Sequence, residues 1–524
     1  MNGFDRRRFL GLGFLGLGGA AGAALAAGGL AAGATWASPA QRSRFTSHPF
    51  ALGVASGDPL PSGVVLWTRL APEPLAEDGS GGMRGRGAVP VRWEVAEDER
   101  FSRRVAHGVA NATAELGHSV HVEVDTLRPD REYFYRFRAG GEISPVGRTR
   151  TAPTAAANLD RLAFAFVSCQ NYPAGYYTAH RHLADEDLRA VVHLGDYIYE
   201  GGATGNIGRA HAPAHEVHSL ADYRIRHAQY RTDPDLQRSH AAFPWIVTWD
   251  DHEVENNYAD EISQHDGVAP GDFLVRRAAA YQAYYEHLPL RRSSVPKGPD
   301  MRIYRRLRFG ALAEFNVLDG RQYRSDQVDR NSPEAQDPDR SMLGAEQERW
   351  LLDGLGSSTA RWNILAQQTV MARADRDPGE GLRLPMDNWN GYEPARQRLF
   401  DGVVERGVEN MVVITGDAHC SMAADLKQDF ADPESPTVGA EFLGTSISSG
   451  GDGADTDRRG EQWLAANPHM KFYNQRRGYV RCTVDRDSYR ADYRAVPYVT
   501  RRGAPVSTLA GFVVENGRPG VQEV

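Results

Sequence analysis

Four short apolar runs in this chain each end in residues that can bind a metal ion. The runs occupy residues 162–169, 191–200, 245–252 and 411–419. Their ends offer a thiol, a phenol, carboxylates and imidazoles: Cys169, Asp196, Tyr199, Asp251, His252, Asp417 and His419. Open α/β sheets place ligands at the carboxyl ends of their strands, so we expect these side chains to meet. The pattern predicts a metal site.

Hydrolysis of a phosphate ester is one reaction that such a site suits. The reaction needs an oxygen nucleophile at neutral pH and positive charge beside the phosphoryl group, and paired metal ions supply both. Asp196 has two oxygens with which to bridge two metals, and Tyr199 offers a phenolate, a hard ligand that favours ferric iron over zinc. Cys169 offers a thiolate. Asp417 and His419, two residues apart, can point into the same site.

Each of these residues also has a purely structural interpretation. A cysteine at a strand end is commonly a small core residue, a tyrosine can pack a loop, and Asp417 can cap a following helix. We favour the metal site because all four apolar runs end in residues that can bind a metal ion.

The composition is that of a folded protein, and the length of the chain indicates two domains. The chain has 524 residues, more than one ordinary domain needs. Its formal net charge of -8 argues against nucleic acid or an anionic membrane as a partner bound through bulk charge. Three cysteines are too few for a disulfide framework, so we expect no structural disulfide.

Residues 1–37 resemble a twin-arginine export signal. Asp5-Arg-Arg-Arg-Phe-Leu10 precedes a segment rich in Gly, Ala and Leu, and small residues near Ala37 suit a signal peptidase. The alternative is a membrane anchor, but the segment is only weakly apolar. We therefore expect the twin-arginine export machinery as a partner, no stable membrane span after cleavage, and a secreted, periplasmic or cell-wall location.

The remaining chain divides at a linker rich in Ala, Thr and Pro, residues 151–158. Short alternating strands predict an all-β domain over residues 44–152, similar by analogy to immunoglobulin or fibronectin type III sandwiches, with a turn at Gly53–Asp58. Residues 159–510 alternate between strand and helix patterns, which indicates an α/β domain. Predicted helices cover residues 174–188, 221–231, 273–286, 344–355 and 394–406, and further strands cover 301–309, 312–318 and 362–367.

Four motifs in order carry a resemblance to a known family. They are Cys169-Gln-Asn, Gly195-Asp-Tyr-Ile-Tyr-Glu200, Trp249-Asp-Asp-His-Glu253 and Gly416-Asp-Ala-His419, supported by Leu318-Asp-Gly-Arg-Gln-Tyr-Arg324, Leu343-Gly-Ala-Glu-Gln-Glu-Arg-Trp-Leu351 and Asn388-Trp-Asn-Gly-Tyr392. The chain resembles the PhoD-type alkaline phosphatases, a branch of the calcineurin-like metallophosphatases related to purple acid phosphatases. The likeness covers nearly all of the chain after the leader.

The resemblance implies an α/β metallophosphatase sandwich, two mixed sheets flanked by helices, that hydrolyses phosphate monoesters and diesters by attack of a metal-bound hydroxide. It implies a ferric ion, Fe(3+), held by Cys169, Asp196, Tyr199 and His419. Calcium, Ca(2+), is implied near Asp196, Asp251 and Asp417, because a carboxylate replaces the usual Asn of the third motif. His252 then faces the leaving oxygen as general acid or charge stabiliser.

Two arginines are candidates for forked contacts with phosphate. Arg321 and Arg324 follow a predicted strand that ends at Asp319, although a solvated salt bridge is the alternative. Trp389 and Tyr392 are predicted either to form an aromatic wall over the leaving group or to pack a loop. Surface loops at residues 200–219 and 324–340 would shape the substrate site.

Three functions remain open from the sequence. The first is a secreted alkaline phosphatase that releases phosphate from organic esters. The second is a phosphodiesterase specific for nucleotides or a wall polymer. The third is an exported adhesion or binding protein in which the metals are structural, and such a site would tend to be coordinatively closed.

Overall fold

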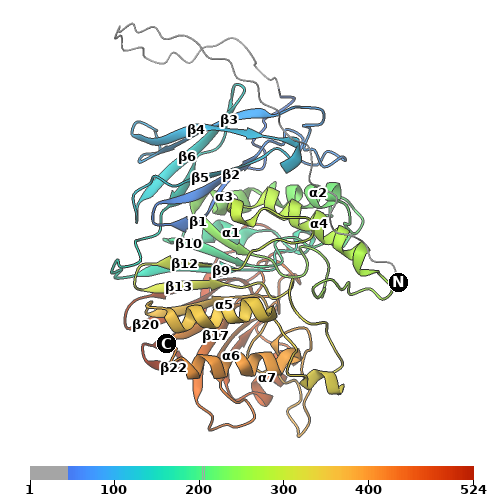
Figure 1. Ribbon diagram of the computed structural model, residues 1–524, viewed down its shortest axis with the longest axis vertical. Coiled ribbons are helices and arrows are strands. Elements are labelled where there is room, and N and C mark those ends of the chain that lie inside the picture. The colour runs from blue at the N-terminus through green and yellow to red at the C-terminus, as the bar shows by residue number, and fades with distance from the viewer. Residues whose placement is uncertain (1–44, 203–204, 206) are drawn as a thin grey trace, which may run out of the picture. The chain divides into compact units, whose positions relative to one another are not determined.

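Two mixed β-sheets pack face to face in the computed structural model, which describes residues 45–202, 205 and 207–524 (Figure 1). The first sheet has ten strands in the order β22-β21-β20-β19-β9-β10-β11-β1-β2-β5. Its strands are β1 (Val54–Leu60), β2 (Gly63–Arg69), β5 (Ser119–Val124), β9 (Leu162–Val167), β10 (Ala190–Leu194), β11 (Pro244–Thr248), β19 (Arg477–Val484), β20 (Ser488–Val496), β21 (Ser507–Glu515) and β22 (Arg518–Glu523). Strands β9, β10, β11 and β1 run parallel, so the carboxyl ends of these four meet at one edge.

The second sheet has seven strands in the order β12-β13-β14-β15-β17-β16-β18. They are β12 (Arg305–Phe309), β13 (Ala313–Val317), β14 (Trp362–Ala366), β15 (Met411–Thr415), β16 (Ser421–Lys427), β17 (Thr437–Leu443) and β18 (Met470–Asn474). Its central strands β13, β14, β15 and β17 are also parallel. The predicted strand at residues 301–309 begins only at Arg305, because the first four residues form an irregular segment.

Alternation along the strands builds the core between the sheets. In β9, Phe164 and Phe166 face the second sheet, where they join Phe315 and Ile364, whereas Ala165 lies in the core on the opposite face. A strand buried on both faces reads as a continuous apolar run, which is why β9, β10 and β15 were visible in the sequence.

Seven helices cover the outer faces of the two sheets in the described part of the chain: α1 (Thr178–Leu183), α2 (Leu220–Arg231), α3 (Pro234–Ala242), α4 (Pro270–His287), α5 (Gly344–Ser357), α6 (Glu393–Glu405) and α7 (Arg458–Ala466). Buried side chains of α1 to α4 pack on the ten-stranded sheet, and those of α5 to α7 pack on the seven-stranded sheet. Figure 1 shows these helices beside the sheets. This arrangement confirms the prediction of mixed sheets flanked by helices.

Four predicted helices match α2, α4, α5 and α6 closely, whereas the prediction at residues 174–188 is too long. Only Thr178–Leu183 is α-helical there, after a 3-10 turn at Tyr172–Ala174. Helices α3 and α7 were not predicted. Each begins at an aspartate cap, Asp233 and Asp457, whose side chain accepts backbone N–H bonds, and this capping signal could have identified both.

A third sheet lies in the segment before the linker and consists of β3 (Val89–Ala96), β4 (Arg104–Ala112), β6 (Glu132–Ala139), β7 (Glu142–Ile143) and β8 (Gly147–Arg150). The same segment supplies β1, β2 and β5 to the ten-stranded sheet, so a shared sheet joins the two predicted domains. The turn predicted at Gly53–Asp58 is wrong: most of it lies in β1, which pairs with β2 and β11. The likeness to immunoglobulin sandwiches and the boundaries 44–152 and 159–510 stay predictions.

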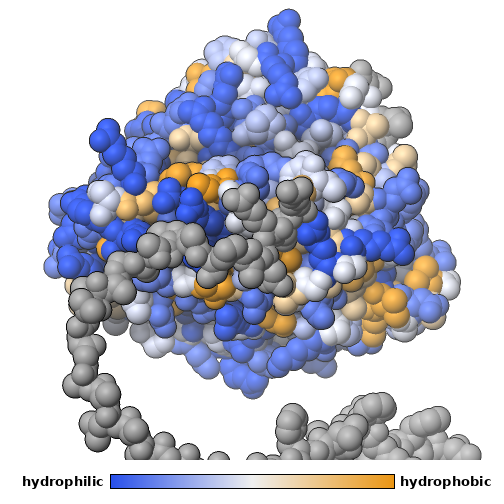
Figure 2. All heavy atoms as spheres, turned by 90° about the horizontal axis from the view of Figure 1, so that it is seen from above, coloured by the Kyte–Doolittle hydropathy of each residue, from blue (hydrophilic) through white to orange (hydrophobic). Residues whose placement is uncertain are grey.

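The face seen in Figure 2 is mainly hydrophilic, with hydrophobic residues scattered over it. Among the residues that the structure describes, no helix is long and apolar enough to cross a membrane. The predicted signal at residues 1–37 lies outside the described residues. All three cysteines lie within them, and each is free and buried.

Two buried histidines make the fold sensitive to acid. Burial lowers the pKa of His180, on α1, and of His227, on α2, to about 3, and nearby arginines add to the effect at His227. An unfolded histidine binds its proton near pH 6.5. The contribution of these residues to the free energy of unfolding is therefore complete above pH 6.5 and is lost as the pH falls toward 3.

We expect the free energy of unfolding to fall with acidity by up to about 1.4 kcal/mol per pH unit for each histidine. Within the described structure, neither ring nitrogen of His227 has a hydrogen-bond partner, so His227→Phe should reduce this slope in urea titrations between pH 4.5 and 7. The exposed His215, changed to Gln, is the control. An unchanged slope in His227→Phe would exclude this explanation.

Candidate metal centre

The predicted ligands sit on tight turns that follow the parallel strands. Cys169, Asp196, Asp417 and His419 all have positive φ angles, of 57°, 56°, 66° and 56°. Such left-handed conformations are uncommon in residues other than glycine and cost of order 1–3 kcal/mol each. Four such residues lie at one edge of the sandwich. This indicates that the fold holds their side chains in fixed orientations.

One group of ligand atoms converges around the hydroxyl of Tyr199. This hydroxyl donates to Asp196 Oδ2 at 2.8 Å, lies 3.0 Å from His419 Nε2 and accepts a hydrogen bond from Ser449 at 2.8 Å. Ligand atoms of Cys169, Asp196 and His419 lie within 4.8 Å of one another. The structure therefore brings together the four residues predicted to hold iron.

A second group shares Asp196 with the first. Ligand atoms of Asp196, Asp251 and His252 lie within 4.8 Å of one another. Asp417 belongs to the same region, because burial and the carboxylates of Asp250, Asp251 and Asp387 raise its pKa well above the usual value. The two groups therefore share Asp196, and its role as a bridge between two ions stays a prediction.

The chemistry of this donor set fits metal ions. Five aspartates face one another with two arginines among them: Asp196, Asp250, Asp251, Asp387 and Asp417, with Arg321 and Arg324. Among the described atoms, Asp196 Oδ1 is buried without a hydrogen-bond partner. Burial and nearby carboxylates raise the pKa values of Cys169 and Tyr199 well above their usual range. A bound cation would both neutralise the carboxylates and permit a thiolate and a phenolate to form.

His252 is held by a carboxylate that had no role in the sequence prediction. Its Nδ1 lies 2.7 Å from Oε2 of Glu200, whose other oxygen accepts the backbone N–H of Asn256. Burial opposes the charged form, but Glu200, Asp196 and Asp251 raise the pKa of His252 well above its usual value. The ring lies against Tyr199, tilted by 32° with centroids 4.2 Å apart, and it can therefore present a protonated Nε2.

Arg321 and Arg324 lie near the second group but are bound to protein carboxylates. Arg321 makes a forked contact with Asp387, two bonds of 3.0 Å, and its Nε donates to Asp250. Arg324 binds the same Asp387 side chain. Both arginines therefore form salt bridges, which was the alternative to phosphate contacts. These salt bridges are buried, whereas the sequence analysis expected a solvated one.

Trp389 and Tyr392 pack the loop that carries Asp387. The Trp389 indole donates to Gln367 at 3.0 Å and the Tyr392 hydroxyl donates to the backbone of Ser325 at 2.7 Å. Both side chains are buried. They therefore pack a loop, as one of the two predictions had it, and do not form an aromatic wall over the leaving group.

Glu253 is a further residue whose role was missed. Its carboxylate accepts backbone N–H bonds from Asp196, Tyr197 and Asp250, and so ties the turn after β10 to the turn after β11. Glu200 and Glu253 are each the last residue of one of the four family motifs, and this position could have drawn attention to them in the sequence. The role of Asp387 could have been suspected because this residue directly precedes the motif Asn388-Trp-Asn-Gly-Tyr392.

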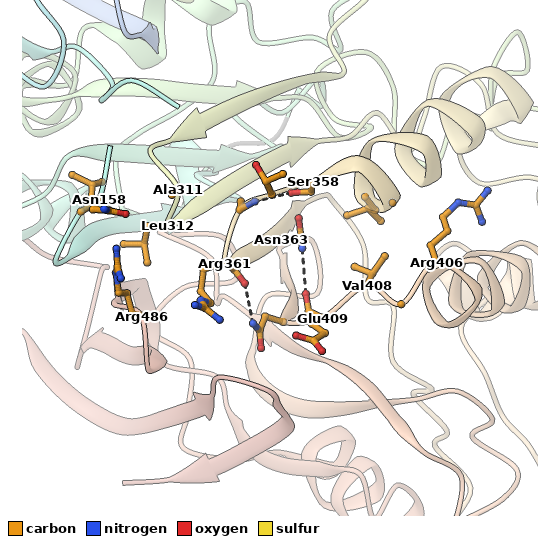
Figure 3. Close-up of a pocket in the computed structure, with 17 residues that line it drawn as sticks. Asn158, Ala311, Leu312, Ser358, Arg361, Asn363, Arg406, Val408, Glu409 and Arg486 are labelled. Carbon is orange, nitrogen blue, oxygen red and sulfur yellow. Dashed lines mark hydrogen bonds between the residues drawn. The ribbon is translucent and has the colours of Figure 1, made fainter. Parts of the chain in front are cut away.

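The pocket in Figure 3 lies away from this centre. Its volume is about 480 Å³, and Leu312, Arg361 and Asn410 on its wall directly precede β13, β14 and β15. It therefore opens at the amino ends of strands whose carboxyl ends lead to the metal centre. Its arginines, Arg361, Arg406 and Arg486, lie apart around the wall (Figure 3).

Comparisons with known proteins agree with the resemblance that the motifs carry. Residues 164–493 match the family model described as PhoD-like phosphatase, and residues 35–153 match that of the PhoD-like phosphatase N-terminal domain. Alkaline phosphatase D of Bacillus subtilis (strain 168) is 53% identical over 491 residues, which cover 92% of this chain and 83% of that protein. A solved structure described as "Structure of PhoD" has a TM-score of 0.89 and 52% identity, over 92% of this chain and 93% of that one. The resemblance predicted from the motifs is confirmed, and this chain belongs to the PhoD-like phosphatase family.

Proposed function

We propose that this chain is an exported, metal-dependent alkaline phosphatase that hydrolyses phosphate monoesters and diesters. Its family makes it a phosphoric ester hydrolase. One observation carries the proposal. The Tyr199 hydroxyl lies within hydrogen-bond distance of Asp196 Oδ2 and His419 Nε2, and Cys169 lies beside them. A phenol, a thiol, a carboxylate and an imidazole form a donor set that suits ferric iron.

We assign the ferric ion to Cys169, Asp196, Tyr199 and His419, and calcium to the neighbourhood of Asp196, Asp251 and Asp417. The three aspartates of this assignment offer only oxygen ligands, which supports calcium. When bound, the ions supply Lewis acidity and lower the pKa of water.

The side chains of this chain supply proton transfer and orientation. His252, held at Nδ1 by Glu200, is oriented to give the proton on Nε2 to the leaving oxygen of the ester. Glu253 holds the backbone of the ligand turns. Contact of Arg321 and Arg324 with phosphate stays a prediction, and it requires Asp387 to release part of their guanidinium groups.

The test is to measure metal content and visible absorption together. The purified protein should contain iron and absorb visible light, because phenolate and thiolate ligands of ferric iron give charge-transfer bands. Tyr199→Phe should shift or remove part of that band. Chelation should abolish activity, and added calcium should restore it because calcium exchanges readily at oxygen ligands.

Tyr197→Phe is the matched control, since Tyr197 is a neighbouring buried tyrosine whose hydroxyl bonds to His240 rather than to the centre. Its spectrum should equal that of the unmodified protein. A colourless, fully active enzyme would refute the iron assignment. Restoration by zinc or magnesium alone, without calcium, would refute the calcium assignment.

Export and an immunoglobulin-like arrangement within residues 44–152 are also part of the proposal. The basis for export is the arginine motif at residues 5–10 and the weakly apolar segment after it. An immunoglobulin-like arrangement is supported by the antiparallel pairing of β3 with β4 and β6.

A further inference from the structure

Glu216, Glu255 and His265, here named the Glu–His cluster, form a group of potential metal ligands outside the metal centre. One ligand atom of each residue lies within 4.8 Å of the other two. In the described part of the chain, two further groups meet this criterion, and both of them belong to the metal centre. The Glu–His cluster shares no residue with either of them.

Arg276 holds the two carboxylates together without using all of their oxygens. Its Nη1 donates to Glu255, and its Nη2 donates to Glu216 Oε1 at 2.7 Å. Glu255 is buried, and its Oε1 accepts the backbone N–H of Gln264 at 2.8 Å. Within the described ranges, Oε2 of Glu216 accepts no hydrogen bond. One arginine thus faces two carboxylates, which leaves a net negative charge and a free oxygen.

Two exposed histidines lie near the Glu216 carboxylate. His265 Nε2 lies 4.0 Å from Glu216 Oε1, and His218 Nε2 lies 3.9 Å from the same oxygen. Ligand atoms around a tetrahedral zinc ion lie about 3.4 Å apart, since each bond is about 2.1 Å long. Both rings are more than half exposed. A small rotation of an exposed side chain is therefore enough to complete the geometry.

The donor types of the Glu–His cluster favour a transition metal over calcium. Calcium takes oxygen ligands, whereas imidazole suits zinc, copper, iron and nickel. Two carboxylates and one imidazole leave one position of a tetrahedral zinc site for His218 or a water molecule. The cluster therefore differs in chemistry from Asp251 and Asp417, the aspartates assigned to calcium.

The Glu–His cluster also adjoins the two segments that contact Glu200, the partner of the proposed general acid. Glu216 precedes Val217, whose backbone N–H donates to the carbonyl of Glu200 at 3.0 Å. Glu255 precedes Asn256, whose backbone N–H donates to Glu200 Oε1 at 2.8 Å. A metal ion in the cluster would therefore join the two segments that hold Glu200.

We propose that the Glu–His cluster binds a divalent transition metal ion, with zinc as the ion that its donors fit, and that this ion crosslinks residues 216–218 to residues 255–265. The site is separate from the metal centre and does not depend on the proposed reaction. Its effect is to restrain Glu200 through the backbone on both sides.

The experiment adds zinc to the metal-loaded enzyme in excess calcium and measures binding by calorimetry, with iron and calcium content determined on the same samples. The unmodified enzyme should bind a single zinc ion without loss of iron or calcium. His265→Gln should weaken this binding about a hundredfold or more, because it removes a direct ligand, and loss of a supporting contact alone commonly costs about ten- to a hundredfold. The ring of His265 is exposed, so the change should leave the fold intact.

His215→Gln is the matched control, since His215 is an exposed histidine next to Glu216 whose Nε2 faces Asp222 rather than the cluster. It should leave the affinity for zinc unchanged. Equal affinity in the unmodified enzyme and in His265→Gln would overturn the site. Zinc uptake matched by loss of calcium would also overturn it, because the zinc would then lie at the metal centre.

Amide hydrogen exchange tests the crosslink. Zinc should slow exchange at the backbone N–H groups of Val217 and Asn256 in the unmodified enzyme but not in His265→Gln, because both groups bond to Glu200. Unchanged exchange at both positions with zinc bound would contradict the crosslink. Neither measurement depends on hydrolysis, so failure of the proposed phosphatase function would leave this inference standing.

Discussion

Asp196→Asn is expected to lower kcat/KM for phosphate-ester hydrolysis by about a thousandfold or more and to remove both metals. Asp196 is the residue that the two ligand groups share. Asparagine keeps the size of the side chain but loses its charge and one of the two oxygens needed for bridging. The Lewis acidity of the ions is worth several kcal/mol in the transition state, and each 1.4 kcal/mol is a factor of ten.

The controls for Asp196→Asn separate bridging from the loss of a buried charge. Asp492→Asn removes a buried carboxylate that pairs with Arg481 and Arg490 far along the sheet, on β20. It should keep metal content and kcat/KM per folded molecule, although it costs stability. Cys169→Ser should deplete the iron and Asp251→Asn the calcium, because each belongs to one group. Retention of both metals by Asp196→Asn would contradict the bridging role.

His252→Ala is expected to slow hydrolysis of an alkyl phosphate about a hundred- to ten-thousandfold, the usual contribution of a general acid. Hydrolysis of p-nitrophenyl phosphate should fall much less, because p-nitrophenolate leaves without needing a proton. Both metals should be retained. The measurement is the ratio of kcat/KM for the two substrates, with metal content determined on the same samples.

Glu200→Gln provides a graded companion to His252→Ala. It keeps an acceptor near His252 Nδ1 but removes the charge that favours the protonated ring. We expect a smaller change in the same direction of leaving-group dependence. Equal losses for both esters in His252→Ala would instead indicate phosphate binding, and loss of metal would make His252 a ligand.

The convergence of the candidate ligands could be predicted because its pattern is local. A buried parallel strand is a short apolar run, and the residue after it lies at the edge where parallel strands end. Cys169 and Asp196 lie two residues after the ends of β9 and β10, and His419 lies four residues after the end of β15. The phenol of Tyr199 is three residues from Asp196, so one turn brings them to 2.8 Å.

The sequence by itself determined the strand ends, the donor types and the family. Only the tertiary structure decided what these groups touch, because partners such as Arg321 and Asp387 are 66 residues apart and meet across two loops. The pairing of β1 with β11 likewise joins segments that no local pattern connects. Hydrogen bonds and ion pairs between distant segments depend on how the sheets pack, and packing is a property of the whole core rather than of any motif. For that reason the arginines expected at phosphate were found on aspartates.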